Sequence, residues 1–473
     1  MNVIVFGAGL VGWQLARQLV VEGKEVTIIE NDPETARRVA DRLDCRIVIG
    51  EGNSFPVLQK AGIERADFFI GVTESDEINM VACSLVAAEY TEPVTVARVR
   101  NVSYSASRMM RHRLYGIDHI INPEIEAARA VIHSMEHGAV GTVNPFTESG
   151  LTMTSIMVVP GCDFIGQSVR ELRLKLTVDF LIPLIVSDGR TAIPTGETII
   201  QANDMLYVIA GHEGTDALIK AAGLKRRELR RIAIAGGGRI GRYVAEHLLG
   251  ITDDRTAIIG AGTWARLTGH LRRRVSNRSV HFIERDYTIG QELAATYPNA
   301  LVTNADISDE EVSDTGILEG YDLLVCATGN QELNLVSALH AKNHGVARTI
   351  ALVRKASYVT MAQEMGVDVT ISVTDTMVES ILRILRKGNI SGIHSIIGSD
   401  FEVIEFLLDS HSPLVNKTIK DTKIPKNSLI LMVIREKEFL IPTGDMKILE
   451  GDRVMLITLS ESVKKLEEAV VGL

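Results

Sequence analysis

Cysteine is scarce in this sequence, which has only 4 among 473 residues: Cys45, Cys83, Cys162 and Cys326. No two of them form a C-x-x-C pair, so the sequence offers neither a zinc knuckle nor a redox dithiol. Isolated thiols of this kind are typical of small buried side chains in a reducing compartment. We therefore expect a cytoplasmic protein without a metal site.

Long apolar runs and excess positive charge are also missing. The densest apolar stretches, 80–88 and 180–186, fall far short of the ~20 residues that a membrane-spanning helix needs. The uncharged opening, 1–16, lacks the basic start of a signal peptide. Fifty Lys+Arg against 60 Asp+Glu give a net charge of −10, the wrong sign for neutralising phosphates of nucleic acid. We expect no membrane insertion and no nucleic-acid partner.

Glycine is plentiful, with 39 residues, and some of it belongs to a long internal repeat. The segment 193–197, Ile-Pro-Thr-Gly-Glu, recurs at 441–445 as Ile-Pro-Thr-Gly-Asp. Other pieces recur in the same order: Val96–Arg100 as Ile350–Arg354, and Thr73 with Asn79 as Thr328 with Asn334. A repeat that spans the chain in one order indicates a tandem duplication.

Each copy divides into two parts by its hydrophobic pattern. Residues 1–135 and 230–385 alternate short β-branched runs with helical periodicity, which predicts βαβ units on a parallel sheet. Residues 140–224 and 395–473 show alternating strands, Pro-x-Gly turns and a closing helix. The predicted fold class is α/β: two Rossmann-like doubly wound domains, each followed by a small α+β domain. A charged linker at 225–231 joins the halves.

The first copy opens with a glycine motif after an apolar strand. Its residues are Gly7, Ala8, Gly9, Leu10, Val11 and Gly12. Glu30 follows at the end of the next predicted strand, at the spacing of a dinucleotide-binding fingerprint. The glycines would admit a pyrophosphate to the helix N-terminus, and Glu30 would accept from ribose hydroxyls while repelling a 2′-phosphate. The motif favours NAD or adenosine nucleotides over NADP; the alternative is a glycine turn that serves packing alone.

Further candidates follow the later strands of the first copy. Asn53 and Thr73 come after the third and fourth strands, at the edge where open α/β sheets bind their ligands. Arg98 ends the fifth strand, where it would reach a phosphate or pair with a nearby carboxylate. For Glu30→Ala we expect weaker nucleotide binding with the fold intact.

The second copy has a drifted version of this site. Its turn consists of Gly236, Gly237, Gly238, Arg239, Ile240 and Gly241. Its acidic residue is Glu284, but an insertion separates the two and contains a rival glycine motif, 260–265. We favour Gly236–Gly241 because its offset to the linker matches the first copy. From the insertion we expect tighter dinucleotide binding in the first half. Arg239 would incline the second half towards ATP, unless drift has emptied that site.

Residues for catalysis are hard to find. None of the 9 tyrosines is followed four residues later by lysine, as a short-chain dehydrogenase requires, and the small domains lack a cluster of acid–base side chains. We therefore expect no enzyme. A nicotinamide-dependent oxidoreductase and a scaffold that binds no nucleotide remain as alternatives.

Together these motifs resemble the TrkA family, the peripheral nucleotide-binding subunits of Trk-type potassium uptake systems, built from two RCK units. The resemblance rests on Gly7–Gly12 with Glu30, Thr73–Met80, Ala97–Arg100 and the Ile-Pro-Thr-Gly signatures of both small domains. It implies a homo-oligomeric ring on the cytoplasmic face of an integral membrane potassium-translocating subunit. It also implies gating by NAD(H) or by ATP and ADP.

Overall fold

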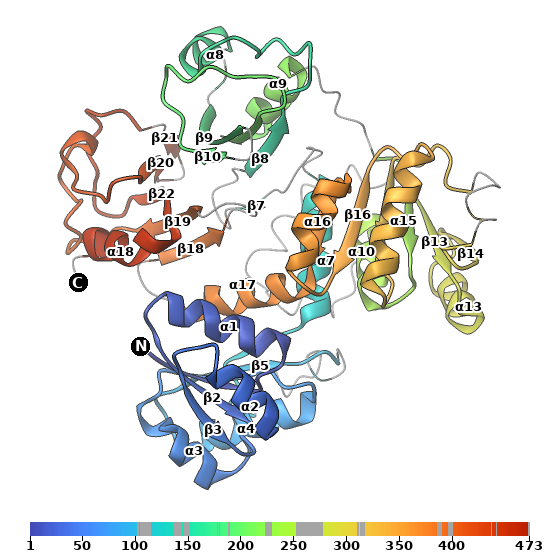
Figure 1. Cartoon of the computed structure of the whole chain (residues 1–473), viewed down its shortest axis with the longest axis vertical. Helices are drawn as coiled ribbons and strands as arrows, with labels where there is room; N and C mark the ends of the chain where they lie inside the picture. Colours follow the sequence, from blue (N-terminus) through green and yellow to red (C-terminus); the bar gives the residue numbers. More distant parts are fainter. Residues whose placement is uncertain are drawn as a thin grey trace. The chain divides into compact units, whose positions relative to one another are not determined.

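The computed structural model describes residues 1–101, 104, 115–136, 144–145, 152–176, 178, 180–187, 190–222, 229–251, 278–309, 312, 317–385, 390–395, 401–436, 438–440 and 442–471. It confirms the expected α/β class, with two parallel sheets and two small antiparallel sheets (Figure 1). The chain forms two compact units. One comprises Met1–Ile132 with Leu229–Leu385, and the other His133–Glu228 with Arg386–Leu473. The four domain boundaries stay predictions, and most of the charged linker lies outside the described residues.

The first parallel sheet has the strand order β3-β2-β1-β4-β5-β6. Its elements are β1 (Asn2–Phe6), α1 (Leu10–Val21), β2 (Glu25–Glu30), α2 (Pro33–Ala40), β3 (Arg46–Ile49), α3 (Phe55–Ala61), η1 (Ile63–Arg65), β4 (Phe68–Gly71), α4 (Asp76–Glu89), β5 (Val94–Arg98), β6 (His119–Ile121) and α7 (Pro123–Glu136). The strands are short and apolar because helices cover a parallel sheet on both faces. The order reverses between β1 and β4, which creates the crevice where doubly wound sheets bind ligands.

The second parallel sheet repeats this plan with the order β14-β13-β12-β15-β16-β17. Its elements are β12 (Arg231–Ala235), α10 (Arg239–Leu249), β13 (Ser279–Glu284), α13 (Tyr287–Thr296), β14 (Leu301–Asn304), β15 (Leu323–Cys326), α15 (Gln331–Asn343), β16 (Thr349–Val353), α16 (Ser357–Met365), β17 (Val369–Ser372) and α17 (Val373–Leu385). The insertion separates α10 from β13, and yet β12 pairs in register with both β13 and β15. The sheet therefore forms as it does in the first copy.

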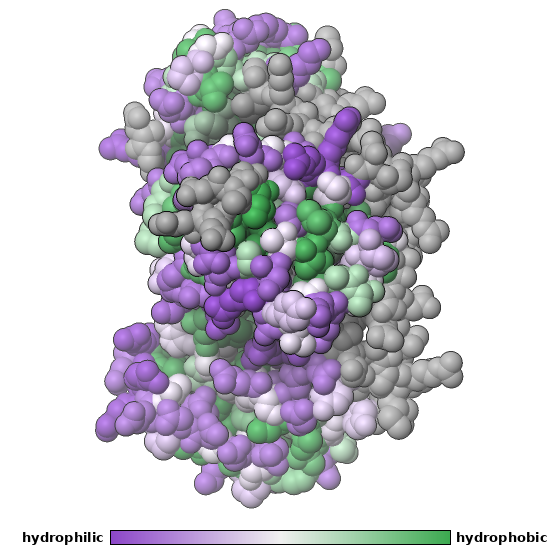
Figure 2. All heavy atoms as spheres, turned by 90° about the vertical axis from the view of Figure 1, so that its right-hand side faces the viewer, coloured by the Kyte–Doolittle hydropathy of each residue, from purple (hydrophilic) through white to green (hydrophobic). Residues whose placement is uncertain are grey.

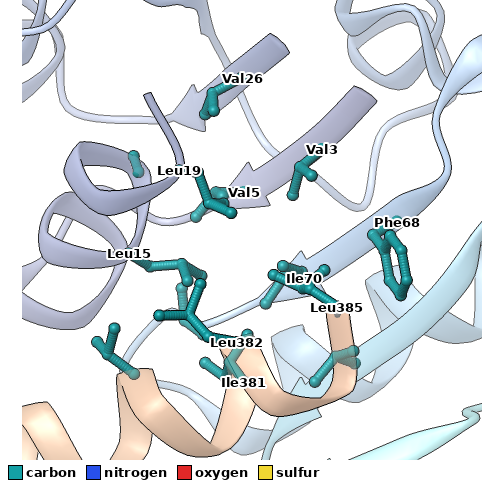
Figure 3. Packing of buried hydrophobic residues seen from close by; sticks show 14 of the residues in the cluster. Val3, Val5, Leu15, Leu19, Val26, Phe68, Ile70, Ile381, Leu382 and Leu385 are labelled. Atoms are coloured by element: carbon teal, nitrogen blue, oxygen red, sulfur yellow. The ribbon is translucent and has the colours of Figure 1, made fainter. Parts of the chain in front are cut away.

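Helix α17 belongs to the second Rossmann domain by sequence but completes the core of the first. Ile381, Leu382 and Leu385 are buried in one cluster with Leu15 and Leu19 of α1, as Figure 3 shows. Polar contacts flank this cluster: the Gln14 amide donates to the Asp375 carboxylate, and Ser380 Oγ donates to Glu126 Oε2 of α7 at 3.1 Å. The two Rossmann domains are thus joined through a shared hydrophobic core.

The small domains are antiparallel sheets with the orders β10-β9-β11-β8-β7 and β18-β19-β22-β20-β21. Their elements are β7 (Asn144–Pro145), β8 (Thr152–Met157), α8 (Val169–Lys175), β9 (Phe180–Ser187), β10 (Arg190–Ala192), β11 (Met205–Ala210), α9 (His212–Ala221), β18 (Ile390–Ser395), β19 (Phe401–Leu407), η3 (Ile419–Asp421), β20 (Leu429–Arg435), β21 (Glu438–Leu440), β22 (Arg453–Leu459), η4 (Ser460–Ser462) and α18 (Val463–Val471). Met153, Leu184 and Ile209 of the first pack with Val403 and Leu431 of the second in one buried cluster. The small domains therefore also share a core.

None of the helices in the described ranges is long and apolar enough to cross a lipid bilayer. On the face drawn in Figure 2, hydrophobic residues form small areas among hydrophilic ones. Scattered apolar side chains of this kind are usual on protein surfaces.

Candidate functional site

Both glycine motifs form tight turns between the first strand and the first helix of their sheets. Gly7 has a φ of +101° and Gly236 one of +103°, a region that favours glycine. A Cβ on Gly12 would lie 1.8 Å from the Gly7 carbonyl oxygen, and one on Gly241 would lie 2.3 Å from that of Gly236. The structure thus places Gly236–Gly241 where the first copy has Gly7–Gly12. The rival motif at 260–265 lies outside the described residues.

The helices that follow these turns begin without a side-chain cap. Gly9 and Gly238 are the N-cap residues of α1 and α10, and neither position supplies a side-chain acceptor. By contrast, Asp32, Ser75, Asp286 and Asn330 cap α2, α4, α13 and α15 through their side chains. A Cβ on Gly9 or Gly238 would meet no atom within 4 Å. The first turns of α1 and α10 therefore lack a side-chain cap, and the exposed Gly9 and Gly238 leave room beside them, as an anion-binding helix N-terminus requires.

The acidic residues lie beside the turns, as the fingerprint predicts, but they already accept hydrogen bonds there. Glu30 Oε2 accepts from Ala8 N at 2.7 Å, and its Oε1 accepts from Asp32 N at 2.9 Å. Glu284 repeats the arrangement with Gly237 N at 2.6 Å and Asp286 N at 2.9 Å. Each carboxylate oxygen has a further lone pair for a ribose hydroxyl. The carboxylates therefore fix the turn as well as offering acceptors to a ligand.

A buried asparagine holds the other side of each crevice. Asn79 Oδ1 accepts from Thr73 N at 2.9 Å and from Thr73 Oγ1 at 2.7 Å, while its Nδ2 donates to the Arg98 carbonyl at 3.0 Å. Asn334 Oδ1 accepts from Thr328 N at 3.0 Å and from Thr328 Oγ1 at 2.6 Å. The sequence shows this Thr–Asn pair only as a repeat, and the structure explains it. The threonine hydroxyl proton is directed at the asparagine, so the hydroxyl oxygen acts towards any further group as an acceptor.

The two remaining candidates of the first copy differ in their environment. Asn53 is exposed on the loop after β3. Arg98 is partly buried at the end of β5, where its Nη1 donates to the Thr73 carbonyl at 2.9 Å. Its buried Nε finds no acceptor in the part of the chain that the structure describes. Burial lowers the pKa of Arg98, because desolvation disfavours the charged form.

Two cavities lie along the carboxyl edge of the second parallel sheet. One of about 550 Å³ is lined by residues that include Gly236, Glu284, Arg285 and Asp306. The other, of about 610 Å³, reaches from this edge to the first Rossmann domain, where it meets Glu74, Asp76, Arg100 and Glu124. Gly238, Ala327, Thr328 and Gly329 line both, so the cavities adjoin. Each is of a size that holds a small ligand.

Arg239 faces the first Rossmann domain rather than the cavity beside Glu284. Its Nη1 lies 3.6 Å from Glu124 Oε1 and donates to the Arg100 carbonyl at 3.4 Å. Arg100 Nε also contacts Glu124 Oε1, at 2.7 Å, and the buried Oε2 of Glu124 has no hydrogen-bond partner among the described residues. Sequence reasoning missed Arg100 and Glu124 as lining residues; the repeated Ala97–Arg100 segment was the available signal.

The remaining candidates, the residues between the motif glycines, contribute mainly through their backbone. Leu10 is 47 % exposed at the first turn of α1, whereas Ala8 is buried and supplies the N–H that Glu30 accepts. Val11 and Ile240 are half-buried, each the second residue of its helix. Within the described ranges, no three His, Cys, Asp or Glu side chains are grouped so that they could hold a metal ion.

Comparison with known proteins places this geometry in a family. The TrkA-N domain model matches residues 3–123 and 256–373, and the TrkA-C domain model matches residues 153–223 and 403–470. The second TrkA-N match begins inside the insertion, so it leaves out strand β12, which the structure places in the sheet, and helix α10, which follows it.

Curated relatives agree with the family match, and a solved structure shares the fold. The chain is 29 % identical to the Trk system potassium uptake protein TrkA of Halomonas elongata, over 98 % of this chain and 96 % of the relative. It is also 29 % identical to a TrkA homolog of Archaeoglobus fulgidus, over 99 % of both. Among solved structures it resembles the GsuK channel bound to NAD, with a TM-score of 0.57 and 17 % identity over 100 % of this chain and 79 % of that one. This likeness concerns the fold.

Proposed function

The chain belongs to the TrkA family, and we propose that it is the regulatory, nucleotide-sensing subunit of a potassium uptake system. Its ligands are NAD(H) or ATP and ADP, held at the carboxyl edges of the two Rossmann sheets. The observation that carries the proposal is the uncapped helix N-terminus beside a buried, hydrogen-bonded glutamate, present in both copies. This arrangement receives a phosphate and a ribose together.

The partner and location follow from the relatives' names rather than from any surface of this chain. Relatives are named as potassium uptake proteins of Trk systems. We propose that this chain assembles as a homo-oligomer on the cytoplasmic side of an integral membrane potassium-translocating subunit. Its attachment to the membrane is then peripheral, through that subunit.

Helix α1 offers a route from bound nucleotide to the rest of the molecule. Its N-terminus would receive the phosphate, and its buried face packs on Ile381 and Leu382 of α17. The chain continues from α17 into the second small domain. A ligand that favours one position of α1 against α17 would therefore bias the arrangement of the domains, and through it the partner's conductance.

Native mass spectrometry of the full chain with NAD⁺, NADH, ATP, ADP and GTP tests the proposal. We expect adenine nucleotides and NAD(H) to bind, and GTP to bind with lower affinity. We also expect the spectra to show an oligomer of one defined size. A chain that binds none of them would be the scaffold, and the proposal would fail. Steady oxidation of NADH in the presence of carbonyl compounds would instead favour the oxidoreductase.

A further inference from the structure

We propose that the two halves hold different nucleotides: a nucleoside polyphosphate, ATP or ADP, in the first Rossmann domain and the dinucleotide NAD(H) in the second. This inference rests on the proposed function and assigns a ligand class to each of its two sites. The assignment depends on one position that differs between the two ligand crevices. This position is Arg98 in the first copy and Leu352 in the second.

The same hydrogen bond shows that these two residues are equivalent. Asn79 Nδ2 donates to the carbonyl of Arg98 at 3.0 Å, and Asn334 Nδ2 donates to the carbonyl of Leu352 at 2.9 Å. Arg98 on β5 and Leu352 on β16 therefore occupy equivalent positions, near the crevice where the strand order of each sheet reverses. The part of a nucleotide that extends past the glycine turn would therefore meet the Arg98 guanidinium in the first half. In the second half it would meet the isobutyl group of Leu352.

Arg98 suits an additional phosphate. Its Nη1 is held by the Thr73 carbonyl, and its Nε is buried without an acceptor among the described residues. Two of the neighbouring carboxylates accept from other groups: Asp76 from the backbone N–H groups of Arg100 and Asn101, and Glu124, through Oε1, from Arg100. A partly desolvated guanidinium interacts strongly with an anion, and phosphate supplies the acceptors it lacks.

Leu352 suits an uncharged ring. It is 4 % exposed and, with Val353, gives an apolar wall to the cavity of about 610 Å³. That cavity adjoins the one beside Glu284 through Thr328 and Gly329. The two adjoining cavities together offer room for the two halves of a dinucleotide. The adenosine would lie beside Glu284 and the nicotinamide riboside beside Leu352.

Two of the arginines that line the cavity of about 610 Å³ are already bonded to the protein itself. The Arg239 guanidinium contacts Glu124 and the Arg100 carbonyl, and Arg354 Nη2 donates to the Gly329 carbonyl at 3.3 Å. The expectation from the sequence was the opposite: the insertion favoured the dinucleotide in the first half, and Arg239 inside the phosphate turn favoured ATP in the second. The argument from Arg239 loses its basis because its guanidinium lies against the first domain, and the insertion left the second sheet in register.

The experiment uses the full-length chain, titrated with ATP and with NADH by calorimetry and followed by native mass spectrometry with both present. We expect one of each nucleotide per chain, bound together without competition. Arg98→Leu should weaken ATP binding about tenfold to a hundredfold, the effect of one charge-assisted hydrogen bond, and leave NADH unchanged. Leucine already occupies this position in the second half, so the variant should fold, and Arg98→Lys should retain part of the affinity.

Matched variants of the acidic residues assign each ligand to its half. Glu284→Gln should weaken NADH and spare ATP, and Glu30→Gln should do the reverse. The inference is overturned if ATP displaces NADH, if Arg98→Leu leaves ATP affinity unchanged, or if Glu30→Gln removes NADH. Binding of both nucleotides without this sorting rejects the inference alone, whereas a chain that binds neither rejects the proposed function as well.

Discussion

Single residues at the two crevices combine ligand chemistry with structural support. The fingerprint in the sequence correctly indicated that Glu30 and Glu284 lie beside their glycine turns. It did not reveal that each carboxylate is already bonded to two backbone N–H groups. The spacing of residues in a motif indicates which of them lie close together. It does not indicate how many carboxylate lone pairs are still available to a ligand.

Replacing Glu30 with alanine should therefore affect stability as well as binding. The N–H groups of Ala8 and Asp32 would lose their acceptor, at about 1–3 kcal/mol for each group that stays buried. We expect weaker nucleotide binding together with a lower midpoint of urea unfolding, contrary to the expectation of an intact fold. Glu34→Ala on the exposed first turn of α2 is the control. An unchanged midpoint for Glu30→Ala would show that water replaces the carboxylate.

His281 makes the stability of the second Rossmann domain depend on pH. Its ring nitrogens lie 2.6 Å from Tyr321 Oη and 2.8 Å from Thr303 Oγ1. Burial, assisted by the charge of Arg231, lowers its pKa to about 4. The unfolded chain, with a histidine pKa of about 6.5, binds the proton more readily, so stability is complete above about pH 6.5 and falls towards pH 4.

The prediction is checked by comparing the protein with His281→Gln, which keeps hydrogen-bonding groups but does not titrate. Between pH 7.5 and pH 5 the unmodified chain should lose about 1–2 kcal/mol more of its unfolding free energy than the variant. Urea unfolding at the two pH values measures this difference. Equal losses would mean that His281 is protonated in the native state.

At the scale of elements, the sequence predicted which helices and strands form better than it predicted what they pack against. Strands and helices alternate along both regions for which the pattern predicted βαβ units, 1–135 and 230–385. The periodicity of 373–385 indicates an amphipathic helix, but its apolar face carries no information on which sheet it covers. Only the structure shows that α17 leaves its own domain and packs on α1.

Because α17 of the second half packs on α1 of the first, we expect a substitution in α17 to destabilise the first Rossmann domain. Leu382→Ala should cost about 2–5 kcal/mol of unfolding free energy, the usual effect of removing a buried leucine side chain. Trp13 packs at the edge of the same cluster, so its fluorescence, in a Trp264→Phe background, reports on the first domain. Arg383→Ala, on the exposed face of α17, is the matched control. A Trp13 transition unaffected by Leu382→Ala would contradict the shared core.

At the scale of the whole molecule, the net charge of −10 bears on membrane attachment. An acidic chain is repelled by anionic headgroups unless a basic amphipathic segment offsets the charge. We expect the purified protein not to sediment with protein-free anionic vesicles at physiological ionic strength. Vesicles that carry a potassium-translocating subunit should retain it. Binding to the bare vesicles would contradict peripheral attachment through a partner.

The duplication suggests two independent halves, but the shared cores indicate that neither half is complete. Without residues 226–473 the first Rossmann domain would expose the surface that α17 covers, and each small domain would lose its partner sheet. We expect the fragments 1–225 and 226–473 to aggregate or bind nucleotide poorly when prepared separately, since each exposes an apolar face that is normally buried.

Co-expression of the two fragments should restore a one-to-one complex, because the buried faces are complementary and the break comes after α9 and before β12. Size-exclusion chromatography with light scattering measures the assembly, and nucleotide titration measures recovery of the sites. The second fragment with Leu382→Ala should associate more weakly, whereas Arg383→Ala should not alter association. Separate fragments that remain soluble, monomeric and fully competent to bind nucleotide would show that each half folds by itself, and that α17 contributes little to the first domain.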